Sequence, residues 1–339
     1  MATDNVLVTG ASGHLGVHLI EALDARGIHP RVLLRQELPE EAWGNLRVRP
    51  VIADLADATA EQLAPMLSGI DTVFHLAALV SLRPSDADRI DRTNRRGTIA
   101  MVEACRMAGV RRFVHVSVAA SVGAGTEERD ESSPWNLDTL RIPYLQSKRA
   151  AEAYLLDHAR QHSGSPEIVI ANPSLLIGPP RAIGRWNHGV PRGLNARALA
   201  RLIHFYIDGR LNLVDVRDVA HGLIRLSEIG RDGERYLLTG SSYTIREILD
   251  EMARFVPLGR VRVRLPRRAI VWGATLAALL ADPASDAPAT SVADCFRLLE
   301  FPWRYRNTKA QEELGFEPTP LESSLSDLFG WARAQGVEI

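Results

Sequence analysis

Short apolar runs alternate with helix-like segments through the first half of the chain. The runs include "NVLVTG" (5–10), "PRVLLR" (30–35), "DTVFHLAA" (71–78) and "VRRFVHVS" (110–117), and the segments between them carry apolar residues at helical spacing. Apolar strands that alternate with helices indicate βαβ units, in which helices cover both faces of a parallel sheet. We therefore predict an α/β protein built on a doubly wound parallel sheet.

The pattern changes after about residue 173. The stretch 176–193, "LIGPPRAIGRWNHGVPRG", is rich in Gly and Pro and is typical of a long loop. We predict a main domain over 1–178, to which 212–240 partly returns, and a smaller C-terminal α/β lobe from 179–211 and 241–339 that binds the substrate. The loop 122–143 is long for a compact domain, which favours a lid or substrate loop, and its acidic run "EERDE" (127–131) is predicted to be a solvated face.

Composition narrows the function classes. The chain has 339 residues, 46% of them hydrophobic, and a formal net charge of −1. Basic and acidic residues are mixed, so a nucleic-acid binder is not expected. Cys105 and Cys295 are the only cysteines, the histidines lack metal-ligand spacing, and no secretion signal opens the chain. The apolar segment 269–281 is too short to span a bilayer. We expect a cytoplasmic, soluble protein without a metal site.

The first strand ends in a glycine-rich turn that opens a helix, "VLVTGASGHLGVHLI" (6–20). Gly10 would permit the tight turn, Gly13 would let the backbone approach a pyrophosphate, and Gly16 would let the helix pack on the strand. The helix N-terminus offers N–H groups and positive dipole to an anion. A glycine triplet alone is weak evidence, but this one heads a βαβ series, so it predicts dinucleotide binding and a Rossmann-type fold.

Three polar residues bear on the choice between NADP and NAD. The second predicted strand ends on Arg35, which could pair with a 2′-phosphate, whereas an acidic residue there would select NAD. The competing interpretations are a solvated arginine and a ribose contact by the nearby Glu37. We favour NADP(H), with NAD(H) as the alternative. Asp54, after the third strand, could accept a hydrogen bond from adenine or could cap a helix.

The segment "YLQSK" (144–148) places Tyr144 and Lys148 four residues apart at the start of a predicted helix. A carbonyl that receives a hydride needs a proton donor. A free tyrosine, with a pKa of roughly 10, exchanges protons poorly at neutral pH. A nearby cation would lower that pKa, and residues spaced i, i+4 share a helix face. The pair therefore predicts a proton-transfer group.

With these motifs the sequence resembles the extended short-chain dehydrogenases/reductases, in the branch that contains dihydroflavonol-4-reductase and 3β-hydroxysteroid dehydrogenase. The resemblance covers nearly the whole chain. It rests on "TGASGHLG" (9–16), "FHLAA" (74–78), "NRRGT" (94–98), "FVHVS" (113–117), "YLQSK" (144–148), "NLVDVRDVAHGLIRL" (212–226), "GERYLLTG" (233–240) and "NTKAQEELGFEP" (307–318).

The resemblance implies roles for individual residues. Tyr144 would be the general acid/base, and Lys148 would hold the cofactor ribose. Asn94 would be mainly structural, and His75, at a strand end, is expected to be a satisfied packing residue. The implied cofactor-binding residues are Gly10, Ser12, Gly13, His14, Leu15, Gly16, Arg35, Asp54, Leu55, Ala77, Lys148, Pro173 and Leu176.

One position departs from the family pattern. The strand before the catalytic loop usually ends in two hydroxyl residues, but this chain has Ser117 followed by Val118. Ser117 could orient the carbonyl, Ser121 could reach in from the loop, or the site could work with tyrosine alone. Val118, Ser121 and Trp186 are the predicted substrate contacts.

These observations predict an oxidoreductase that transfers a hydride between NADP(H) and a ketone, aldehyde or secondary alcohol of an apolar or aromatic small molecule. One alternative is an NAD-dependent nucleotide-sugar epimerase or dehydratase, although no acidic residue follows Ser117 as a dehydratase would require. A second alternative is a non-catalytic NADP-sensing regulator. The resemblance also implies a possible homodimer formed through the helices 86–108 and 144–160.

Overall fold

Seven parallel strands form the main sheet of the computed structural model. Their order is β3 (Arg49–Ile52), β2 (Arg31–Leu34), β1 (Val6–Thr9), β4 (Thr72–His75), β5 (Arg112–Val116), β6 (Glu167–Pro173) and β10 (Glu234–Leu238). The structure describes residues 5–81, 84–138, 140, 142–162, 164, 166–180, 205–206, 208–256, 263–264, 298 and 301–335. The strand order reverses direction at β1, as in a doubly wound Rossmann-type sheet, so the predicted fold class is confirmed.

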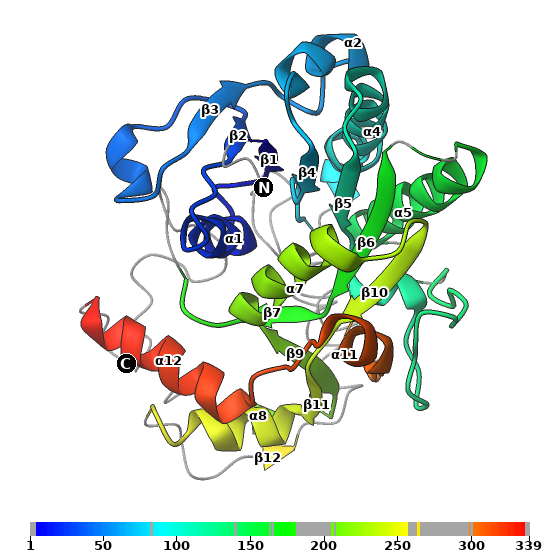
Figure 1. Cartoon of the computed structure of the whole chain (residues 1–339). Helices are drawn as coiled ribbons and strands as arrows, with labels where there is room; N and C mark the ends of the chain where they lie inside the picture. The colour runs from blue at the N-terminus through cyan, green and yellow to red at the C-terminus, as the bar shows by residue number, and fades with distance from the viewer. Residues whose placement is uncertain are drawn as a thin grey trace.

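Helices cover both faces of this sheet (Figure 1). On one face, α1 (His14–Asp24), α7 (Val216–Ile229) and α11 (Thr308–Leu314) pack on residues such as Val8 and Val114. On the other face, α2 (Ala60–Leu63), α4 (Gly97–Ala108) and α5 (Pro143–Gln161) pack on residues such as Leu7 and Phe113. Because side chains alternate along a strand, each buried strand carries apolar residues toward both helix layers.

A second, three-stranded sheet follows, formed by β7 (Leu175–Ile177), β9 (Arg210–Asp215) and β11 (Ser241–Thr244). It packs against α8 (Ile245–Met252) and α12 (Leu321–Ala334) through Leu213, Leu325 and Phe329. A short pair, β8 (Phe205–Tyr206) and β12 (Val263–Arg264), completes the strands of the described residues. Of the segment 212–240, β10 joins the main sheet and α7 covers it, whereas β9 belongs to the second sheet.

Local capping explains where two helices begin. Helix α7 begins at Val216 because the carboxylate of Asp215 accepts from the backbone N–H of Arg217. The run 243–256 divides into β11 and α8 because Thr244 and Glu247 form a capping box.

The helix expected over 86–108 is interrupted. It consists of α3 (Ala87–Ile90), a π-helical turn (Asp91–Arg96) and α4. Within the turn, the Asn94 side chain accepts from the N–H of Leu79 at 2.7 Å and donates to its carbonyl at 3.0 Å. The Thr98 hydroxyl donates to the Asn94 carbonyl at 2.6 Å. Such π-helical turns are frequent at functional sites, and this one fixes the segment after β4.

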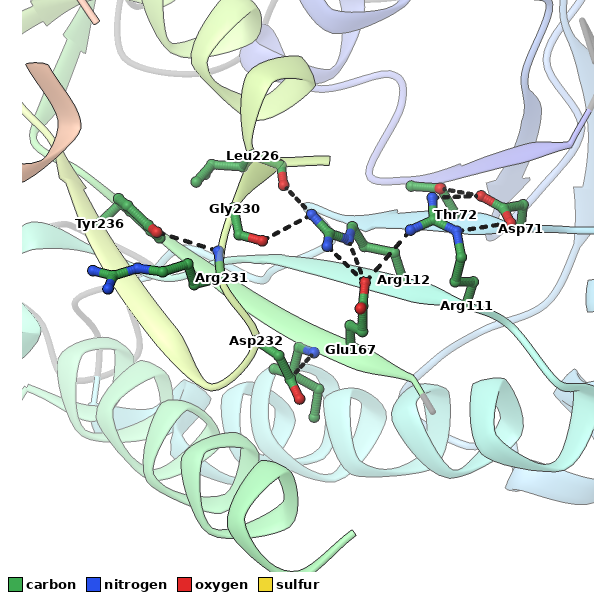
Figure 2. Close-up of polar contacts among 11 residues, drawn as sticks. Asp71, Thr72, Arg111, Arg112, Glu167, Leu226, Gly230, Arg231, Asp232 and Tyr236 are labelled. Atoms are coloured by element: carbon green, nitrogen blue, oxygen red, sulfur yellow. Dashed lines mark hydrogen bonds and ion pairs between the residues drawn. The ribbon is translucent and has the colours of Figure 1, made fainter. Parts of the chain in front are cut away.

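A buried arginine ties the opposite end of the sheet to α7. Arg112, which is 6% exposed, donates from Nη1 to the carbonyls of Leu226 at 2.9 Å and Gly230 at 3.0 Å. Its Nε and Nη2 donate to Glu167 at 3.0 and 2.6 Å. Figure 2 shows the guanidinium between the carboxylate and the end of α7. The positive charge also complements the dipole at the C-terminus of that helix.

Replacing Arg112 with alanine is expected to lower the free energy of unfolding by about 2–4 kcal/mol, because two buried carbonyls lose their donor and Glu167 loses its main cation. Urea denaturation measures the loss. The matched control is Arg111→Ala: Arg111 contacts Asp71 and Glu167 but has a side chain that is 46% exposed, so its loss should stay below about 1 kcal/mol. Equal losses in the two variants would contradict this assignment.

Candidate active site

The glycine-rich turn closes β1 at the point where the strand order reverses. Gly10 has a φ of +69°, and a Cβ atom there would lie 2.7 Å from the backbone nitrogen of Ala77. A Cβ at Gly16 would lie 2.3 Å from the carbonyl oxygen of Gly10. Glycine is therefore required at both positions, so that the segment after β4 and the first turn of α1 can both approach the turn. Ligands bind at such a reversal point in doubly wound sheets.

A cavity of about 460 Å³ opens beside this turn. Its size is in the range of cofactor and small-molecule sites. The part of the turn at Gly13 faces it without obstruction, because a Cβ there would meet only the Gly10 carbonyl, at 3.2 Å. The residues predicted to bind the cofactor that line the cavity are Gly10, Ser12, Gly13, Arg35, Asp54, Leu55 and Ala77. The shape and the donors fit a dinucleotide.

The other residues predicted to bind the cofactor do not line this cavity. His14 begins α1, where burial and the neighbouring His18 lower its pKa. Leu15 points into the hydrophobic core. Pro173 ends β6 and Leu176 lies in β7. Trp186, a predicted substrate contact, lies outside the described residues.

Arg35 is exposed and lines this cavity. It makes no ion pair with any described residue, whereas two other arginines of the lining are paired: Arg89 with Asp86 at 3.6 Å and Arg92 with Asp57 at 3.1 Å. Glu37, the rival residue, does not contribute to the lining. Asp54 lines the cavity, and its carboxylate also accepts from the N–H of Ala56 at 3.0 Å in a local turn.

Tyr144 and Lys148 lie in the first two turns of α5, which begins at Pro143. The Lys148 side chain is 2% exposed, and its ammonium donates to the carbonyl of Val116, at the end of β5, at 2.7 Å. Burial lowers the pKa of Lys148 to about 8. Tyr144 is half-buried, yet its apolar surroundings raise its pKa to about 12.

The expectation that Lys148 lowers the pKa of Tyr144 is therefore not met, because burial of the phenol dominates. The ammonium is directed to a backbone carbonyl, and the described residues show no hydrogen bond between the two side chains.

The two candidate serines lie together. Ser117 and Ser121 are 2% and 1% exposed, and their hydroxyl oxygens are 3.1 Å apart in a hydrogen bond. Ser117 follows β5 on the same face as Phe113, which packs toward α5. Ser121 lies on a 3₁₀ turn, Ala119–Val122. Val118 is extended, half-buried and packed in the apolar cluster that also contacts Tyr144.

His75 is a satisfied core residue, as predicted. Its Nδ1 lies 3.0 Å from the Thr9 hydroxyl, and its Nε2 lies 3.0 Å from the Thr98 hydroxyl. Because Thr98 donates its proton to Asn94, its oxygen accepts from Nε2, so the Thr9 hydroxyl donates to Nδ1. Burial lowers the pKa of His75 to about 3. The ring is therefore neutral and acts in packing.

Asn94 also anchors the start of α5, and its structural role agrees with the prediction. Its amide donates to the Ser147 hydroxyl at 3.0 Å, and that hydroxyl donates to the carbonyl of Tyr144 at 2.8 Å. The π-helical turn therefore holds the tyrosine's backbone.

The loop after Val122 is held at several points rather than exposed along its length. Arg129 donates to the Val122 carbonyl at 3.0 Å, and Asn136 exchanges hydrogen bonds with Ala124 at 3.0 and 2.7 Å. Glu131 accepts from the N–H of Leu237 at 2.8 Å, and burial raises its pKa. The prediction of a solvated face over 127–131 is therefore wrong for Glu131, because β10 supplies a donor to it.

The interpretation of the sequence missed a buried group next to Lys148. Glu152 accepts from Asn172 at 2.7 Å and from Arg235 at 2.9 Å. The i, i+4 spacing of Lys148 and Glu152 could have indicated a shared face. No local signal points to Asn172 or Arg235, which come from β6 and β10.

Among the described residues, no helix has the length and apolar character needed to cross a membrane. In the same part of the chain, no group of three or more His, Cys, Asp or Glu side chains could hold a metal ion.

Comparison with known proteins gives three results. The sequence profile of the "NAD dependent epimerase/dehydratase family" matches residues 6–238. The chain is 30% identical to "Sterol demethylase protein B" of Methylococcus capsulatus, over 98% of this chain and 99% of that one. It is also 30% identical to a "4-hydroxy-2-methyl-3-oxo-4-farnesyl-3,4-dihydroquinoline-1-oxide ketoreductase" of Stigmatella aurantiaca, over 91% and 90% of the two chains. Among solved structures, the crystal structure of gox2253 superposes with a TM-score of 0.79 at 27% identity, covering 98% of this chain and 99% of the other.

Proposed function

Because this chain belongs to the NAD dependent epimerase/dehydratase family, the extended short-chain dehydrogenases/reductases, and is thus an oxidoreductase that uses NAD(P), we propose that it is an NADP(H)-dependent reductase of apolar ketones or aldehydes. The observation that carries the proposal is the buried Lys148, one helical turn from Tyr144, next to the strand end that bears Ser117. This combination would supply the proton donor that reduction of a carbonyl needs.

Separate residues would bind the cofactor and donate the proton. The turn at Gly10 and Gly13, with the N-terminus of α1, would hold the pyrophosphate. Arg35 would pair with the 2′-phosphate. When bound, the nicotinamide supplies the hydride. Lys148 would hold the adjoining ribose, and Tyr144 would donate the proton that the carbonyl oxygen needs.

Ser117 and Ser121 are both candidates for the hydroxyl that orients the carbonyl. Their shared hydrogen bond leaves one hydroxyl proton for a substrate oxygen, because each hydroxyl donates only once. The pair could therefore replace the hydroxyl that is absent at Val118.

The apolar substrate class is supported by the surroundings of Tyr144. Val118, Ala120 and Trp135 pack against the same cluster as Tyr144. Burying an aromatic or polycyclic ketone there would be favourable by about 25 cal/mol per Å² of apolar surface. The names of the sterol and farnesyl-quinoline relatives agree with this class.

The test is consumption of NADPH, with NADH in parallel, across aliphatic, aromatic and polycyclic ketones and aldehydes. We expect turnover of apolar carbonyls with NADPH. Silence across the panel, in the presence of measurable NADPH binding, would contradict the reductase proposal.

The alternative supported by the family name is a nucleotide-sugar epimerase or dehydratase. An epimerase returns its hydride to the same substrate and therefore keeps its cofactor bound. The absorbance spectrum of the purified protein distinguishes the two: retained NAD(H) favours the epimerase, and protein free of cofactor favours the reductase.

A further inference from the structure

The carboxylate of Glu152 lies in the protein interior, one helical turn beyond Lys148 on α5. Side chains four residues apart share a helix face, and the two residues are 0% and 2% exposed. No step of the proposed reaction uses Glu152. A buried carboxylate is costly unless donors satisfy it, so its partners indicate what it does.

Two donors from different strands satisfy this carboxylate. The side-chain amide of Asn172, on β6, donates to Oε2 at 2.7 Å, and Nη1 of Arg235, on β10, donates to Oε1 at 2.9 Å. An ionised carboxylate accepts hydrogen bonds only, and both of its neighbours donate. The guanidinium also balances its charge within the buried site.

Lys148 needs a negative charge nearby in order to stay protonated. Its ammonium donates to the Val116 carbonyl, which carries no net charge. Desolvation lowers the pKa of Lys148, and Glu152 is the group that opposes this effect. The two side chains make no direct hydrogen bond in the described structure, so Glu152 acts on Lys148 through space.

The other titratable groups around Lys148 cannot replace Glu152. His75 on β4 and His115 on β5 are fully buried, and burial together with Lys148 lowers the pKa of both. An imidazole is either neutral or positively charged, so neither histidine supplies a negative charge to the ammonium. Burial raises the pKa of Tyr144 on α5, which favours its neutral phenol.

The same network reaches the turn beside the substrate. The Asn172 amide nitrogen also donates to the Val118 carbonyl at 3.0 Å. That carbonyl accepts from the backbone N–H of Ser121 at 3.0 Å, which closes the turn, and Ser121 bonds to Ser117. Both partners of this nitrogen are acceptors, so the Asn172 amide is oriented with its nitrogen, and not its oxygen, toward Glu152 and Val118.

Arg235 extends the network to the loop after Val122. Its Nε donates to the carbonyl of Glu131 at 2.8 Å. Glu152 is thus the point where the buried lysine, the serine turn and the loop are connected.

We propose that Glu152 is a positioning residue that keeps Lys148 protonated and, through Asn172, holds the turn that carries Ser121. The inference deepens the proposed reductase function and rests on it, because it concerns the same Tyr144–Lys148 pair. Lysine suits this arrangement, since its charge responds to burial and to neighbouring groups, whereas arginine stays protonated.

The sequence offers a direct measurement, because Lys148 and Lys309 are its only lysines. Protein labelled with ¹³C at the lysine Cε gives two NMR signals, and Lys309→Arg assigns them. In Glu152→Gln we expect the titration midpoint of Lys148 to fall by about one pH unit or more, a tenfold rise in its acid dissociation constant. Glu103→Gln, which removes a carboxylate that contacts Tyr154 on α5, should leave the midpoint in place.

Kinetics and binding give a second readout. Ketone reduction requires protonated Lys148 and protonated Tyr144, so activity falls as pH rises through the lower of the two pKa values. In Glu152→Gln the upper limb of the kcat/KM profile should move to lower pH, and the Kd for NADPH should rise at lower pH than in wild type. Asn172→Ala keeps the Glu152 charge but frees the Val118 turn, so it should lower kcat without moving the Lys148 midpoint.

An unchanged Lys148 midpoint in folded Glu152→Gln would overturn the proposal. So would an equal loss of activity at every pH, which would make Glu152 a purely structural residue. If the single variant does not fold, Glu152→Gln combined with Arg235→Gln leaves no unpaired buried charge and should still lower the midpoint, but by less than the single variant, because a positive charge near the ammonium is removed as well. A wild type that reduces no carbonyl would contradict the proposed function alone, because the NMR titration still tests Glu152.

Discussion

Replacing Tyr144 with phenylalanine is expected to lower kcat for ketone reduction by about 10²–10⁴-fold, the usual contribution of a positioned general acid. The half-buried phenol packs against an apolar cluster, so phenylalanine should fit in its place. The Kd for NADPH should therefore remain close to the wild-type value. Stopped-flow or steady-state consumption of NADPH measures the first quantity, and fluorescence titration measures the second.

The matched control is Tyr154→Phe, on the same helix. Tyr154 donates to Glu103 at 3.0 Å, away from the cofactor cavity, so its replacement should leave kcat nearly unchanged. Full activity of the Tyr144 variant would mean that another group donates the proton.

Replacing Arg35 with alanine is expected to raise the KM for NADPH by about 10–100-fold, because a hydrogen bond to a charged group contributes about 1.5–3 kcal/mol. The KM for NADH should change little, because NADH lacks the 2′-phosphate. Arg35 is free of ion pairs among the described residues and lines the cavity, so the phosphate would not have to displace a carboxylate. Initial rates with the two cofactors measure the change in preference.

Arg47→Ala provides the control for this variant. It removes the same charge at a residue that pairs with Asp24 at 3.7 Å and does not line the cavity. Preference for NADPH should persist in it. A parallel loss with NADPH and NADH in Arg35→Ala would show that Arg35 acts on the adenosine common to both, and would leave the NADP assignment without its main support.

The catalytic pair carries a pH dependence that follows from burial. With the pKa of Lys148 near 8, the ammonium is present below that pH and is lost as pH rises through it. Burial raises the pKa of Tyr144 to about 12, so the lysine limits reduction before the tyrosine does.

Several features could be predicted from the sequence because their causes are local. The apolar strand runs predict the parallel sheet, since strands buried on both faces must be apolar. The positive φ of Gly10 and the close contact at Gly16 follow from a turn that only glycine permits. Arg35 and Asp54 line the cavity because each lies within two residues of the carboxyl end of a strand.

Other features depend on residues far apart in the chain. The raised pKa of Tyr144 comes from the apolar residues packed around it rather than from the lysine four positions away. Glu131, in an acidic run, is held by β10, more than a hundred residues later. The partners of Glu152 come from β6 and β10, which lie side by side only in the folded sheet.

The sequence by itself determined which chemical groups are available: the glycine turn, the tyrosine–lysine pair and the serines at the end of β5. Only the tertiary structure decided which of them are buried, paired or free. The reason is physical, because local backbone preferences depend on near neighbours, whereas desolvation and charge–charge interactions depend on everything that packs around a group.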